Sequence, residues 1–316
     1  MQQVKLPGSG KLTSRIGLGC GRLVGGAHDQ SSQKVLEAAL SAGITHFDVA
    51  PSYGLGLAER LVGSAVSGNP LCTVTTKVGI ARPKNGEGLS LARRHLRPLV
   101  ARLPALKGAM LYLLRKPASS PRAMDPQTVR NALAESLEQL GLDYVDTFIL
   151  HEIYDTSPEL VRTFDELVSE GMIGAYGAST GKELSQLPAF GSIRQFSWNP
   201  TNSPGSEFFV QHGVVRRWMA AFRAALPDVE SKCRLNDLFE LDMKDPESHA
   251  SALLTLALNQ CPGSIFLLSS NSSQRILRTT KGINWRSVEN PSPEFLSMSD
   301  DLMRNISIYE KSATKS

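Results

Sequence analysis

Strand-like and helix-like segments alternate along the first 200 residues of this 316-residue chain, and that order constrains the fold more than any other feature. Short apolar runs are followed by amphipathic segments, several of which begin at Asp-Pro or Ser-Pro and end at Gly, as helices do. Such alternation favours a parallel α/β architecture. The expected strands are 16–20, 44–49, 73–77, 145–150, 173–178, 193–198 and 264–268.

We interpret this pattern as a (β/α)8 TIM barrel with an N-terminal hairpin over 4–12, and expect residues 1–316 to form one domain. Residues 201–245 hold a helix at Val214–Leu226 but no recognisable seventh strand. A doubly wound sheet is the alternative, but it needs G-x-G-x-x-G after the first strand, and Gly17–Gly21 has another spacing. The other expected helices are 32–42, 57–66, 126–140, 157–170, 246–259, 273–280 and 293–311.

Composition argues against several function classes. Hydrophobic residues make up 41% of the chain and charged residues 20%, which allows a large core. A net charge of +4 without a nucleic-acid motif gives no reason to expect a nucleic-acid partner. The sequence contains no run of 18 apolar residues, so we expect no membrane span. Without a signal pattern or a C-x-x-C pair, we expect a cytoplasmic protein with no metal site and reduced cysteines, namely Cys20, Cys72, Cys233 and Cys261.

Polar side chains stand where three successive strands are expected to end. Asp48 closes the second expected strand, Lys77 closes the third and His151 follows the fourth. Tyr53 lies in the turn just after the strand of Asp48. Each residue alone also fits a structural role, such as a helix cap or a solvated charge. The carboxyl ends of barrel strands carry the chemistry of TIM barrels, however, so we expect the four side chains to share one pocket.

These four residue types suit the reduction of a carbonyl. A carbonyl that accepts hydride builds negative charge on oxygen and needs a proton donor within hydrogen-bond distance. Tyr53 can donate, and we expect the Lys77 ammonium to lower its pKa from the ordinary value of about 10. Asp48 would hold Lys77 charged and oriented, while His151 would direct the carbonyl oxygen toward Tyr53.

Longer motifs around these residues resemble the aldo-keto reductase family, in particular its aldose and pyridoxal dehydrogenase-like branch. The resemblance covers residues 14–200 and, more weakly, 260–280. It implies a (β/α)8 barrel, NAD(P)-dependent interconversion of an aldehyde or ketone and its alcohol, and a catalytic tetrad of Asp48, Tyr53, Lys77 and His151. The motifs are Phe47–Glu59, Thr76–Gly79, Ser136–Asp146 and Leu150-His151.

The resemblance also implies residues that bind the nicotinamide. Ser179 and Thr180 stand where the family has Ser and Asn on the carboxamide, although the Thr hydroxyl does not offer the paired groups of an amide. Gln195 matches a further carboxamide ligand. The aromatic residue that stacks on the ring is expected after residue 199, with Trp218 as a candidate. Two further expected contacts at the end of the first strand are Gly19 and Cys20.

A phosphate-binding stretch is expected after strand 264–268. Ser270, Ser272 and Arg275 would face the adenosine 2′-phosphate, for which a guanidinium offers a planar fork. Ser269 stands where many members have Lys, and Thr279 replaces the Asn that usually binds adenine. We therefore favour NADP(H), with NAD(H) possible, and expect a small carbonyl or alcohol as substrate.

Residues 80–124 form a long basic insertion after the third strand. It holds ten Lys or Arg and one acidic residue, a local charge of +9. Since the insertion leaves a carboxyl strand end, it is expected over the mouth of the site. It fits a basic lid that favours anionic or phosphorylated substrates, a solvated loop, or a membrane-surface helix, which Pro98 and Pro104 would interrupt.

Two other functions fit parts of this pattern. Lys77 could act as a Schiff-base nucleophile on a sugar carbonyl, but that needs a neutral amine, and Asp48 favours the ammonium. A barrel that binds nicotinamide and senses redox state without significant turnover fits the departures at Ser269, Thr180 and Thr279. An intact tetrad weighs against it.

Overall fold

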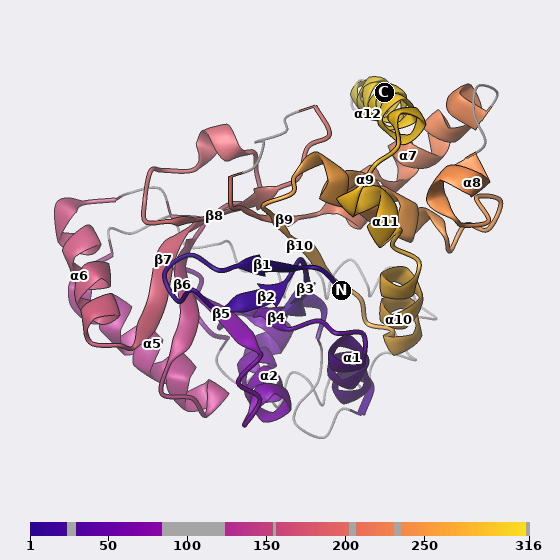
Figure 1. The fold of residues 1–316 in the computed structure, drawn as a ribbon. Coiled ribbons are helices and arrows are strands. Elements are labelled where there is room, and N and C mark those ends of the chain that lie inside the picture. Colours follow the sequence, from indigo (N-terminus) through magenta and orange to yellow (C-terminus); the bar gives the residue numbers. More distant parts are fainter. Residues whose placement is uncertain (24–29, 84–123, 154–155, 202–206, 231–234, 314–316) are drawn as a thin grey trace, which may run out of the picture.

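Eight parallel strands form a closed barrel in a computed structural model that describes residues 1–23, 30–83, 124–153, 156–201, 207–230 and 235–313. Their order around the barrel is β10-β3-β4-β5-β6-β7-β8-β9 (Figure 1). The architecture is the predicted (β/α)8 barrel, and the closed ring excludes a doubly wound sheet. The strands are β3 Ile16–Gly19, β4 His46–Asp48, β5 Thr73–Val78, β6 Val145–His151, β7 Ile173–Ser179, β8 Ile193–Ser197, β9 Val210–His212 and β10 Ile265–Leu268.

Helices surround this barrel, and one long C-terminal helix lies outside it against α7 (Figure 1). Most begin and end within three residues of the predicted bounds. The helix expected from residue 246 begins later, because Asp242–Ser248 forms turns in which Asp245 O accepts from Ser248 N. The helices are α1 Gln30–Ser41, α2 Ala58–Val66, α5 Pro126–Leu140, α6 Pro158–Ser169, α7 Val214–Glu230, α8 Leu235–Phe239, α9 His249–Gln260, α10 Ser273–Lys281, α11 Trp285–Glu289 and α12 Pro293–Ala313.

The predicted helix-start signals work as expected. Asp125 precedes α5, and its side chain accepts the backbone N–H of Thr128 at 2.9 Å. Ser157 does the same for α6, where its hydroxyl accepts Leu160 N at 3.2 Å. A proline follows each cap at the first helical position, where no intrahelical N–H is needed. The two caps therefore fix the residue at which each helix begins.

The N-terminal hairpin closes the end of the barrel opposite the site. Strands β1 Gln3–Lys5 and β2 Leu12–Ser14 pair antiparallel and lie across the barrel (Figure 1). Leu6, between them, is fully buried and packs with Ile149, Ile193 and Ile265 of the barrel. This apolar plug excludes water from below, so the barrel opens at its carboxyl end.

The seventh strand, which the sequence did not reveal, is β9. It has three residues, Val210–His212, and pairs with β8 on one side and β10 on the other. A buried strand this short has no alternating pattern that distinguishes it from a loop. It nevertheless matters, because it carries His212 into the pocket described below.

Most of the basic insertion lies outside the described residues, as does Cys233, so the three hypotheses for residues 80–124 stay open. Cys20, Cys72 and Cys261 are buried thiols. Within the described ranges, no helix is long and apolar enough to cross a membrane.

Candidate active site

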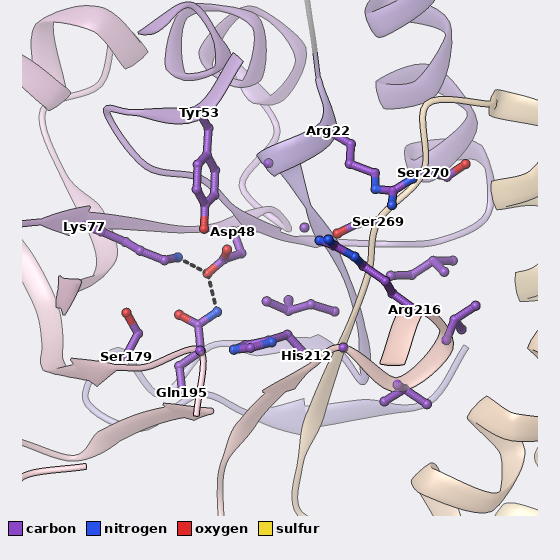
Figure 2. A pocket seen from close by; sticks show the side chains of 18 of the residues that line it. Arg22, Asp48, Tyr53, Lys77, Ser179, Gln195, His212, Arg216, Ser269 and Ser270 are labelled. Atoms are coloured by element: carbon purple, nitrogen blue, oxygen red, sulfur yellow. Dashed lines mark hydrogen bonds and ion pairs between the residues drawn. The ribbon is translucent and has the colours of Figure 1, made fainter. Parts of the chain in front are cut away.

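The four predicted catalytic residues line one pocket at the carboxyl end of the barrel. Figure 2 shows three of them, Asp48, Tyr53 and Lys77. Asp48, Lys77 and His151 come from β4, β5 and β6, which are neighbours in the barrel, and Tyr53 begins the turn after β4. The close approach of β5 and β6 requires a glycine after Lys77. A Cβ at Gly79, where φ is +134°, would lie 2.6 Å from the His151 carbonyl oxygen. We call these four side chains the reactive end of the pocket.

A buried ion pair forms the centre of the reactive end. Lys77 Nζ donates to Asp48 Oδ2, and the two side chains are 2% and 3% exposed. Gln195 Nε2 also donates to Asp48 Oδ2, at 2.8 Å. Because burial makes unpaired charges costly, the pair and its amide partner fix one another in place. A Schiff-base role for Lys77 is disfavoured, since Asp48 stabilises the ammonium.

Tyr53 is protonated at neutral pH. Burial, and next the Asp48 carboxylate, raise its pKa well above the ordinary value of about 10. The expectation that Lys77 lowers this pKa is wrong for this arrangement. The ammonium lies 5.6 Å from the Tyr53 ring centroid and is neutralised by Asp48, so desolvation of the phenolate dominates. The result is a neutral phenol that can donate a proton.

His151 is neutral as well. Burial, followed by the nearby Lys77 charge, lowers its pKa to about 4. Its ring meets the Tyr53 ring edge-on, with centroids 5.9 Å apart. Nδ1 is buried and has no hydrogen-bond partner in the described part of the chain. A neutral imidazole beside a phenol can orient a polar ligand atom between the two groups.

Most predicted cofactor residues also line the pocket, which has a volume of about 460 Å³. Gln195 lines the pocket, and its Oε1 is buried without a partner among the described groups, so it is available to accept an amide N–H. The Ser179 hydroxyl donates to Leu150 O at 2.9 Å, and Thr180 Oγ1 donates to Glu152 at 3.2 Å. The predicted residues in the lining are Gly19, Ser179, Thr180, Gln195, Ser270 and Arg275.

Two predicted cofactor residues and the aromatic candidate are placed elsewhere. Cys20 is fully buried behind the pocket, and its thiol lies 3.5 Å from Leu18 O. The Ser272 hydroxyl caps α10 by accepting Arg275 N at 3.3 Å. Trp218 packs in the core and donates to Trp198 O at 2.8 Å.

The opposite end of the pocket is cationic. Figure 2 shows the side chains of Arg22 and Arg216 there, next to Ser269 and Ser270. Arg275, at the start of α10, also lines this end. We call these five residues the cationic end. Guanidinium groups beside the N-terminus of a helix suit phosphate groups.

Sequence reasoning missed the four titratable lining residues Arg22, Glu152, His212 and Arg216. Arg22 ends the short turn Cys20–Arg22 that follows β3, and Arg216 lies in the first turn of α7 after the unrecognised β9, so a position soon after a strand was the signal for both. The His212 ring nitrogen Nε2 lies 3.0 Å from Thr180 O, and burial lowers the pKa of this ring. His212 therefore places a neutral ring in the lining of the pocket, beside Thr180.

The family model described as "Aldo/keto reductase family" matches residues 15–189, just over half of the chain. The chain belongs to this family. Its match to a D-threo-aldose 1-dehydrogenase of Pseudomonas sp. is 33% identical and covers 50% of this chain and 46% of that protein. Its match to an NADH-specific methylglyoxal reductase of Escherichia coli K12 is 30% identical and covers 57% of this chain and 52% of that protein. The matches span about half the length of these curated relatives.

Solved structures of two bacterial family members share the fold of this aldo-keto reductase family member over nearly its whole length. A glycerol dehydrogenase from Gluconobacter oxydans superposes with a TM-score of 0.63 at 20% identity, covering 95% of this chain and 94% of that one. The holo form of an aldo-keto reductase from Bacillus halodurans gives 0.62 at 18% identity, with 96% of both chains covered. At these identities the likeness concerns the fold.

Proposed function

We propose that this protein is an NADP-dependent oxidoreductase that interconverts an aldehyde or ketone and its alcohol by hydride transfer, with Tyr53 as the proton donor. The observation that carries the proposal is the reactive end itself. A protonated phenol, a buried Lys77–Asp48 pair and a neutral His151 face one cavity. Each is a component that carbonyl reduction needs, and family membership supports their combination.

The pocket residues fit a nicotinamide dinucleotide. The partnerless Gln195 Oε1 suits the carboxamide N–H, and the cationic end suits the phosphates. When bound, the reduced nicotinamide supplies the hydride. The His212 ring lines the cavity between these two ends and can pack against the cofactor.

The protein's own residues then manage the proton and the developing charge. Tyr53 donates its hydroxyl proton to the carbonyl oxygen, and His151 holds that oxygen near the phenol. The phenolate that would remain must take up a proton before the next turnover, because burial and the Asp48 carboxylate disfavour its charge. In the alcohol-oxidising direction the same groups act in reverse.

Arg275 supports the preference for NADP over NAD. Arg275 is exposed, lines the cationic end and lies in the first turn of α10. A 2′-phosphate would match the fork of its guanidinium, whereas a ribose hydroxyl would not. The NADH-specific relative makes a direct comparison of the two cofactors necessary.

The first experiment is a fluorescence titration with NADPH and, separately, NADH. We expect NADPH to bind more tightly, with consumption of NADPH when methylglyoxal or another aldehyde is added. NADP⁺ with a D-threo-aldose or glycerol tests the opposite direction. Binding of neither cofactor would reject the proposal.

One observation favours the redox-sensing alternative. Thr180 Oγ1 donates to Glu152 and accepts Lys182 N at 3.1 Å, so its hydroxyl proton is already used within the protein. Cofactor binding without turnover of any carbonyl or alcohol in the panel would support that function instead.

A further inference from the structure

A buried carboxylate connects the strand of Lys77 to the segment that carries Tyr53. Glu59, on α2, is fully buried and does not line the pocket. Its Oε1 accepts the hydroxyl of Thr76, at 2.6 Å, from the residue directly before Lys77 on β5. The Tyr53 turn runs directly into α2, so Glu59 joins the two segments that present the proton donor and the ammonium.

Arg82 completes this connection. Its Nη2 donates to Glu59 Oε2 at 2.5 Å, and its Nη1 donates to the carbonyl oxygen of Gly56 at 2.7 Å. Nε donates to Glu135 of α5 at 2.6 Å. Arg82 is one of the ten basic residues of the insertion, yet its side chain is 16% exposed and bound to two acids. Arg82 is therefore bonded to the Tyr53 turn and is not a free charge over the opening of the pocket.

The Tyr53 turn needs support of this kind. Leu55 has φ +61°, a left-handed conformation that is unfavourable for a side chain with a Cβ. Gly56, with φ +90°, packs so closely that a Cβ there would lie 2.9 Å from Arg82 Cγ. Such backbone persists where neighbouring contacts hold it, and the Gly56 carbonyl is held by Arg82.

We propose that Arg82 and Glu59 are positioning residues that fix Tyr53 relative to Lys77, acting through Gly56 and Thr76. This inference rests on the proposed function of the reactive end. The guanidinium fork binds the turn carbonyl and the carboxylate at once, and lysine lacks that geometry. Because a displacement of about 1 Å can cost roughly 100-fold in rate, loss of the pair lowers turnover while leaving the cofactor groups in place.

The test compares four variants with the unmodified protein. Arg82→Gln leaves Glu59 buried without its cation, so the double variant Glu59→Gln/Arg82→Gln removes both charges and protects the fold. Arg82→Lys keeps the charge without the fork. The matched control is Arg130→Gln on α5, which removes an arginine from a surface ion pair with Glu166 and Glu170.

We expect kcat for aldehyde reduction to fall about 10- to 100-fold in Arg82→Gln and in the double variant. Arg82→Lys should lie between these and wild type, and Arg130→Gln should match wild type. NADPH affinity should change less than about two-fold, and the pH profile of kcat should shift as Tyr53 moves relative to Lys77. Folded variants with wild-type kcat and an unchanged pH profile would overturn the proposal.

Hydrogen–deuterium exchange supplies a readout that does not depend on turnover. Amides of the Tyr53–Gly56 turn should exchange at least about ten-fold faster in the double variant than in Arg130→Gln. Unchanged exchange would refute the positioning role even in an inactive protein. Absence of carbonyl turnover in wild type, with the expected exchange difference, would instead reject the proposed function and leave the contact itself established.

Discussion

The reactive end and the cationic end of the pocket are built in different ways. Asp48 and Lys77 lie on barrel strands, have side chains that are 3% and 2% exposed, and neutralise one another. Arg22, Arg216 and Arg275 come from segments after the strands and are exposed. The first end is held by the hydrogen-bonded ladder of the barrel, and the second by loops and helix starts.

Under the proposed function, we expect this difference to separate turnover from cofactor affinity. Charges in a buried site interact strongly and need no rearrangement during reaction, whereas exposed charges are screened by salt. Changes at the reactive end should therefore alter turnover and folding, and changes at the cationic end should alter cofactor affinity. The following experiments test whether the two ends are separable.

The largest effect is expected from Asp48→Asn. This change leaves the Lys77 ammonium buried without its anion, which typically costs about 3–5 kcal/mol of stability. Turnover should fall as well, because Gln195 also loses the carboxylate to which it donates. Urea unfolding measures the stability loss. Arg130→Gln, which removes a charge from an exposed pair, should cost less than about 1 kcal/mol.

Tyr53→Phe should lower kcat about 1,000-fold, since it deletes the proton donor and little else. NADPH affinity, measured by fluorescence titration, should stay within about two-fold of wild type. Turnover that survives this change would assign the proton to another group.

Acid should destabilise the barrel at β4. Burial lowers the pKa of His46, on β4, to about 4. The unfolded chain binds this proton near pH 6.5, so stability is full above that pH and is lost as pH falls toward 4. Each pKa unit corresponds to about 1.4 kcal/mol, which makes the loss on the order of 3 kcal/mol.

Urea unfolding between pH 7 and pH 4 measures this loss, with His46→Gln as the comparison. The variant should show a shallower pH dependence. His151, whose pKa also falls to about 4, contributes with the same sign and remains in the variant. Equal slopes for the two proteins would show that His46 titrates in the fold as it does in water.

At the cationic end, Arg275→Gln should weaken NADPH binding by about 2 kcal/mol, roughly 30-fold, through loss of charge-assisted hydrogen bonds. NADH affinity should hardly change, because NADH lacks the 2′-phosphate. Parallel titrations with both cofactors measure the difference. An equal loss for both would place Arg275 on the diphosphate instead.

The smallest effect concerns salt. Raising salt from 50 to 500 mM should weaken NADPH binding several-fold through the exposed arginines. At saturating cofactor, kcat should change less than about two-fold, since the reactive end is buried. A kcat that falls in step with affinity would contradict the separation of the two ends.

The same difference explains what could be predicted from the sequence. The reactive end could be predicted because Asp48, Lys77 and His151 stand at the ends of recognisable strands. The starts of α5 and α6 could be predicted from Asp-Pro and Ser-Pro. β9 has too few residues to show a strand pattern. Because this strand was not predicted, His212 and Arg216 were not recognised as pocket residues. Arg82 looked like one charge among ten because its acidic partners, Glu59 and Glu135, are 23 and 53 positions away in the sequence.

The direction of the Tyr53 pKa shift was also predicted wrongly from the sequence. Proximity of Lys77 suggested a lowered Tyr53 pKa, but the sequence does not give the burial of the phenol or the neutralisation of Lys77 by Asp48. Cys20 and Ser272 were predicted as cofactor contacts because they match positions of the family. In the structure, Cys20 is buried and Ser272 caps α10, so neither side chain lines the pocket.

The most direct test of the central claim follows the hydride. The protein is incubated with NADPH carrying two deuterium atoms at nicotinamide C4 and an aldehyde from the panel, such as methylglyoxal, and the alcohol is analysed by mass spectrometry. We expect one deuterium in the product of the wild-type protein and product formation about 1,000-fold slower with Tyr53→Phe. Cofactor binding with an unlabelled product, or with none from any aldehyde or ketone tested, would contradict hydride transfer at this site.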